Sequence, residues 1–264
     1  MQEVKAYQAE CRLLIQRLLT SHPDQLLLFL GDGPSRVAGQ SKGGLLDRFA
    51  SLVALSPSDV STLSRDIACE AAVQCEQEGA LDLAIRLYHM AQRPELVLRL
   101  SVRRLSQAMP LGNPALTQAT QQLIAYYRSL PAVAQQLQPL INLAEKALRL
   151  QAAWELAREG KTDDALAALE SLGILPLQDG AGAAIVELED PLAVHFPIIV
   201  HLASDLIYRR FVSLRGAVDP GTADRIASLR RKSAQLVRFV GMQQRVQIPQ
   251  DICAVLLQHD ALMK

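Results

Sequence analysis

The stretch CEQEGALDLAIRLYHMA, residues 75 to 91, decides the fold because one glycine interrupts an otherwise continuous helical pattern. Inside a helix, Gly79 would cost roughly 0.8 to 1 kcal/mol relative to alanine, so this glycine favours a reversal between two helices. Apolar side chains recur every three or four residues on both sides of the glycine. They are Val60, Leu63, Ile67, Ala71 and Cys75 before it, and Leu81, Ala84, Ile85, Tyr88 and Ala91 after it. The stretch predicts an antiparallel hairpin of two amphipathic helices.

The same pattern occurs again in LAREGKTDDALAALESL, residues 156 to 172. When the two stretches are aligned, the residues equivalent to Gly79, Ala84, Tyr88 and Ala91 are Gly160, Ala165, Leu169 and Leu172. A small residue at the alanine positions lets the two helices of a hairpin approach closely, and the bulky residue four positions later fills the next space. Hairpins used in tandem predict a helical solenoid.

The composition supports an all-α protein, an irregular α-solenoid of antiparallel helix hairpins. Half of the 264 residues are apolar but only 4% are aromatic, which favours helices over strands. We expect one solenoid segment over 1–264: a hairpin stack over 1–172 with a glycine-rich loop at 31–44, and C-terminal helices over 191–264 after a connector at 173–190.

Prolines and glycines predict where further helices begin and end. Helices are expected at about 2–20, 94–110, 115–130, 132–159 and 197–217. Asp219 and Pro220 are expected to begin a helix that ends at Gly241, and Pro249 a last helix that reaches about residue 258.

The sequence contains no pattern that predicts an enzyme, a metal site or a cofactor. In the glycine-rich loop, Ser41 precedes Lys42 and Gly43 follows it, whereas a phosphate-binding loop needs a serine or threonine directly after its lysine. The five histidines include no pair four residues apart that could aim two imidazoles at one metal from a helix. We therefore expect no catalysis and no cofactor.

Positive charge is concentrated near the C-terminal end. Residues 205 to 245 carry nine basic and three acidic side chains, although the whole chain carries 27 of each. Two interpretations remain open: a solvated helix face, or a surface for an acidic partner or a nucleic-acid backbone.

Four stretches, in order, resemble the inner-ring scaffold nucleoporins of the nucleoporin ninety-three or nucleoporin-interacting component ninety-six family. They are CRLLIQRLLTSHPDQLLLFL (11–30), KGGLLDRF (42–49), the hairpin with its flanks (66–109), and RRKSAQLVRFVGMQQRVQIP (230–249) with the terminal ALMK. The resemblance implies the C-terminal portion of the family's helical solenoid, since family members carry several hundred further residues before it.

The resemblance also implies a structural function, without catalysis, in the inner ring of the nuclear pore complex at the nuclear envelope. Such a protein would hold linker segments of other nucleoporins in inter-helix grooves, and so support pore assembly and nucleocytoplasmic transport. The implied partner is the small membrane-associating linker nucleoporin, and no direct contact with nucleic acid is expected.

The expected groove lies where the KGGLLDRF loop meets the first hairpin. Its candidate residues are Gly44, Leu45, Leu46, Phe49 and Tyr88. The alternative is that these five residues pack the core of the hairpin. An alternative for the whole chain is a tetratricopeptide-like adaptor outside the pore, but that repeat recurs every 34 residues, whereas the two glycine corners are 81 residues apart.

Overall fold

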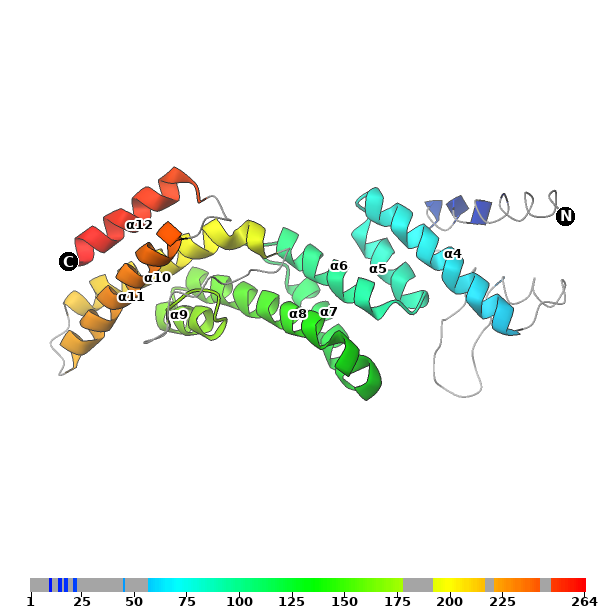
Figure 1. Cartoon of the computed structure of the whole chain (residues 1–264), viewed down its shortest axis with the longest axis horizontal. Coiled ribbons are helices and arrows are strands. Elements are labelled where there is room, and N and C mark those ends of the chain that lie inside the picture. Colours follow the sequence, from blue (N-terminus) through cyan, green and yellow to red (C-terminus); the bar gives the residue numbers. More distant parts are fainter. Residues whose placement is uncertain are drawn as a thin grey trace. The chain divides into compact units, whose positions relative to one another are not determined.

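The computed structural model describes residues 57–177, 192–216, 221–242 and 248–264, together with isolated positions 10, 14, 15, 17, 18, 21, 22 and 45. The labelled elements in these ranges are α-helices and one short 3₁₀ turn, with no strand (Figure 1). The helices are α4 Pro57–Gln77, α5 Leu81–Met90, α6 Pro94–Gln107, α7 Pro114–Arg128, α8 Pro131–Arg158, α9 Thr162–Ser171, α10 Phe196–Arg215, α11 Thr222–Met242 and α12 Gln250–Met263; the 3₁₀ turn is η2 Ala193–His195. The prediction of an all-α fold is confirmed.

Prolines begin several of these helices, as the sequence predicted. Pro94, Pro114 and Pro131 each occupy the first position of a helix, and Pro197 lies in the first turn of α10. A proline is tolerated there because the first backbone N–H groups of a helix have no partner within it. At α7 the side chain of Asn113 adds an N-cap, since its Oδ1 accepts a hydrogen bond from the backbone N–H of Leu116 at 3.2 Å.

The chain divides into two compact units, residues 1–101 and 102–264. In the first unit α4 and α5 pack against each other as an antiparallel pair. Most of the buried side chains of this pair come from the predicted stripes, but Ala68, Ala72 and Leu87 lie outside those stripes. The predicted Leu63 and Ile85 are only half-buried. The buried side chains are Ile67, Ala68, Ala71, Ala72, Cys75, Leu81, Ala84, Leu87 and Tyr88.

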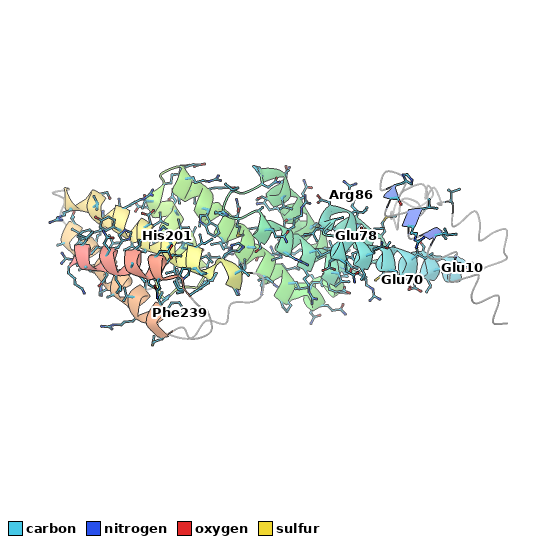
Figure 2. All side chains as sticks on the ribbon, turned by 90° about the horizontal axis from the view of Figure 1, so that it is seen from above. Glu10, Glu70, Glu78, Arg86, His201 and Phe239 are labelled. Carbon is cyan, nitrogen blue, oxygen red and sulfur yellow. The ribbon has the colours of Figure 1, made fainter. Side chains whose placement is uncertain are left out.

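The second unit is a succession of packed helices. α7 packs on α8, α8 on α9 and α9 on α10, while α10, α11 and α12 contact one another (Figure 1). The rings of Phe196 and Phe239 meet edge to face with centroids 5.9 Å apart, and Figure 2 labels Phe239 on α11. The sequence predicted a hairpin stack over 1–172 and C-terminal helices over 191–264. This division of the chain stays a prediction.

Two predicted helix ends near the C-terminus are wrong. α11 continues through Gly241 to Met242, because Gly241 does not adopt the left-handed conformation that ends a helix. α12 extends five residues beyond the predicted end at 258, because packing buries Met263 one turn further on. Asp219 and Pro220 lie outside the described residues, and α11 begins at Thr222.

Other expectations fall largely outside the described residues. These are the first helix at 2–20, of which isolated positions are helical, the loop at 31–44, and the connector beyond residue 177. Among the helices that the structure describes, none combines the length and apolarity that crossing a bilayer requires.

Candidate partner-binding surfaces

Gly79 forms the corner of the first hairpin. Its φ is +80°, in the left-handed region, and it lies between the ends of α4 and α5. The backbone N–H of Ala80 donates to the carbonyl of Cys75 at 2.8 Å, and that of Gly79 to the carbonyl of Glu76 at 3.2 Å. These two bonds define a Schellman motif, which satisfies the last carbonyls of α4 while reversing the chain. Figure 2 labels Glu70 on α4, Glu78 directly before the corner and Arg86 on α5.

Gly160 forms the second corner with the same geometry. Its φ is +77°, the N–H of Lys161 donates to the carbonyl of Leu156 at 3.0 Å, and the N–H of Gly160 donates to that of Ala157 at 3.2 Å. α8 and α9 therefore reverse as α4 and α5 do. The hairpin predicted twice from the sequence is present twice.

The end of α5 uses the same motif with a different residue. Gln92 has a φ of 57°, and it is the one non-glycine residue with positive φ among the described residues. The N–H of Arg93 donates to the carbonyl of Tyr88 at 2.9 Å, and the N–H of Gln92 to that of His89 at 3.1 Å. Because glutamine carries a Cβ, the left-handed position is strained here by about 1–2 kcal/mol. Apart from Pro94, which follows it, no residue pattern predicts this corner.

The residues that occupy equivalent positions in the two hairpins are buried where the helices pack. Ala84 and Ala165 are fully buried, so the helices approach closely at both places. Tyr88 and Leu169 are also buried. Ala91 is buried at the end of α5.

Tyr88 belongs to the core of its own hairpin. Its side chain is 2% exposed, and its hydroxyl donates to Oε2 of Glu76 on α4 at 3.3 Å. Burial, together with the neighbouring Glu76 carboxylate, which repels the phenolate, raises the pKa of Tyr88 to about 12. The tyrosine is therefore a neutral donor that joins α5 to α4.

Of the other four groove candidates, the structure describes only Leu45. Leu45 is helical and half-buried, while Gly44, Leu46 and Phe49 lie outside the described residues. The packing of Tyr88 matches the alternative that it fills the hairpin core. The groove itself stays a prediction.

Three shallow hollows in the described part of the chain were not predicted from the sequence. One of about 450 Å³ lies beside the first hairpin, between the first half of α4 and the strained turn at Gln92. One of about 470 Å³ lies between α7 and α8, and one of about 490 Å³ between α8 and the end of α9. All three are lined mainly by charged and amide side chains, as suits hydrogen bonding to a peptide backbone rather than burial of an apolar ligand.

Two histidines serve packing. Nε2 of His195 lies 2.7 Å from Oγ of Ser106, within hydrogen-bond distance, and its ring meets Trp154 edge to face. His259 stacks on Tyr208 with ring centroids 4.4 Å apart. Burial lowers the pKa of both imidazoles, which favours the neutral ring. Within the described ranges, no three metal-ligating side chains gather at one place.

Comparison with known proteins gives one family and one fold. A sequence model of the Nup93/Nic96 family matches residues 2–254. No curated protein sequence matches the chain. The chain is similar to the crystal structure of Chaetomium thermophilum Nic96 SOL, with a TM-score of 0.78 and 16% identity, covering 95% of this chain and 40% of that chain. At this identity the likeness shows a shared fold, and the predicted α-solenoid is confirmed.

Proposed function

The chain belongs to the Nup93/Nic96 family of inner-ring scaffold proteins of the nuclear pore complex, and we propose that it is a structural segment of that ring which holds linker segments of other nucleoporins. Family members are located at the nuclear envelope. The match over residues 2–254 is the observation that carries the proposal. Because the chain spans 40% of the Nic96 structure, its share of the whole protein's contacts is part of the proposal.

The helix packing suits a structural function. In the second unit each helix from α7 to α10 packs on the next along the chain. Ion pairs join neighbouring helices: Arg210 Nε lies 2.7 Å from Oδ1 of Asp163, and Lys232 pairs with Glu170. Such a stack keeps its surfaces in fixed positions along the unit, which is what a holder of flexible segments needs.

The proposed linker is the small membrane-associating nucleoporin, and the proposed contact is the groove around residues 44–49. A flexible segment binds when a few apolar anchors gain about 25 cal/mol per Å² of buried surface and so exceed the entropy lost on ordering. Leu45, Leu46 and Phe49 are the apolar residues of this stretch that we propose as the anchors. Tyr88, the fifth predicted groove residue, is buried in the hairpin core and is not one of the proposed anchors.

The first test is the cellular location of the full chain. A fluorescently tagged chain is expected at the nuclear rim, and pull-down from a nuclear-envelope extract is expected to recover other inner-ring nucleoporins. A diffuse signal together with no recovery of these proteins would contradict the scaffold assignment.

The second test addresses the linker site with the purified linker nucleoporin. Leu45→Asp and Phe49→Asp are expected to weaken binding at least tenfold, because each removes an apolar anchor worth about 1.5–3 kcal/mol. Val73→Asp, on the exposed face of α4, is the matched control. Tyr88→Phe is expected to retain binding, because it keeps the ring and removes only the bond to Glu76. Unchanged affinity in folded Leu45 and Phe49 variants would eliminate the groove but leave the pore location standing.

The tetratricopeptide-like adaptor is not favoured. The family match extends over residues 2–254, far beyond the hairpin that such a repeat shares. An adaptor outside the pore would bind a partner elsewhere and give no signal at the nuclear rim. The localisation test described above therefore distinguishes the adaptor from the pore scaffold.

A further inference from the structure

The outer face of α11 (orange in Figure 1) carries a row of positive charge that the described residues do not neutralise. The helix Thr222–Met242 has five basic side chains and one acidic one, Asp224. Two of the five are engaged: Lys232 pairs with Glu170 of α9, and Arg230 lies over the ring of Phe211 at 5.7 Å. Arg231 and Arg238 are exposed, and neither forms an ion pair with a residue in the described ranges.

Helical geometry places these two arginines on one line. They are seven residues apart, nearly two turns, or about 10.5 Å along the axis. The buried residues Leu229 and Leu236 each precede an arginine by two positions, so the arginines point away from the core. We call this surface the arginine row. It consists of Arg231 and Arg238, Ala234 between them, and Ala227 one turn before Arg231.

We propose that the arginine row binds an acidic amphipathic helix of a partner protein. Carboxylates seven residues apart on such a helix would match the spacing of the two guanidiniums, each of which can donate two parallel N–H hydrogen bonds to one carboxylate. Ala227 and Ala234 are small, and Gln235, which also lies between the arginines, is half-buried with its Oε1 shielded from solvent, so a second helix can lie close along the row. This surface does not depend on the pore assignment, because it follows from charge and exposure alone.

The surroundings of the row favour a protein helix over RNA or a membrane. Phe239 is buried against Phe196, and Phe211 is buried beneath Arg230, so the described rings near the row are not available to stack with bases. The apolar face of α11 packs on α10 and α12, so the helix has no free apolar face to insert into a bilayer.

The test uses the full 264-residue chain and a synthetic helical peptide with glutamates seven residues apart and alanines between them. Fluorescence anisotropy is expected to show binding that weakens on the order of tenfold when Arg231→Glu and Arg238→Glu are combined. A peptide with lysine in place of each glutamate is expected to bind that double variant and not the wild type. Combining Arg215→Glu with Arg225→Glu gives the same change of charge outside the row, and its affinity is expected to stay within about twofold of wild type.

Circular dichroism checks that each variant folds, and the milder pair Arg231→Gln with Arg238→Gln is expected to weaken binding in the same direction. The proposal is overturned if the glutamate peptide does not bind, or if both charge-reversed pairs weaken it equally. It is also overturned if a single-stranded RNA oligonucleotide, or vesicles of phosphatidylserine and phosphatidylcholine, bind the row more tightly than the peptide does.

Discussion

Replacing Gly160 with alanine tests the physical basis of the hairpin. The added Cβ would meet no atom within 4 Å, so the substitution creates no clash. Its cost is the left-handed backbone, with a φ of +77°, which an alanine adopts at about 1–2 kcal/mol. Alanine also reduces the entropy of the unfolded chain, which returns about 0.4–1 kcal/mol. The free energy of unfolding is therefore expected to fall by about 1 kcal/mol.

Urea denaturation followed by tryptophan fluorescence reports unfolding of the second compact unit, residues 102–264, which contains Gly160. Trp154 is the single tryptophan of the chain, it is 5% exposed, and it lies on α8 near the corner. With a denaturant dependence of roughly 2 kcal/mol per molar urea, the midpoint is expected to move down by about 0.5 M.

Gly216→Ala is the matched control. Gly216 caps α10 with a φ of −97°, and a Cβ there would also meet nothing within 4 Å. Only the entropy effect remains, so this variant is expected to be more stable than wild type by about 0.4–1 kcal/mol. If Gly160→Ala unfolds at the same or a higher urea concentration than wild type, the corner does not depend on a left-handed glycine and the reasoning fails.

Three further substitutions test the helix end, the ion pair and the histidines. Gln92→Gly is expected to raise stability by about 0.5 kcal/mol in thermal melts followed by circular dichroism, because glycine removes the strain of a positive φ; a less stable variant would contradict this. A double-mutant cycle of Lys232→Ala and Glu170→Ala is expected to give a coupling of about 1 kcal/mol, since these side chains are only 15% and 25% exposed, and additive effects would show that the pair contributes nothing. Because burial lowers the folded-state pKa of His195 and His259 below the unfolded value of about 6.5, stability is expected to decrease as pH falls from 6.5 towards the lowered values. His259→Gln should make that decrease shallower in urea titrations, and an identical pH profile would argue against it.

The candidate site shows where prediction from the sequence stops. The sequence predicts a bend at Gly79 and a close helix contact at Ala84, and both are present. Tyr88 satisfies the same helical period whether it lines a groove or fills the core, and only the position of Glu76 across the hairpin places it in the core. Asp163 and Asp164 lie in the first turn of α9, where acidic residues are favoured, but the carboxylate of Asp163 also pairs with Arg210, 47 positions later in the chain.

The sequence by itself determined the helices, their proline starts and the two glycine corners, because these depend on backbone preferences of residues adjacent in the chain. Only the tertiary structure decided which polar groups are paired and which face outward. Arg230, Arg231 and Lys232 are neighbours in the sequence, but they lie over a ring, at the surface and against a carboxylate, respectively. Burial and pairing depend on groups supplied by other helices, here Phe211 of α10 and Glu170 of α9, and no local pattern contains that information.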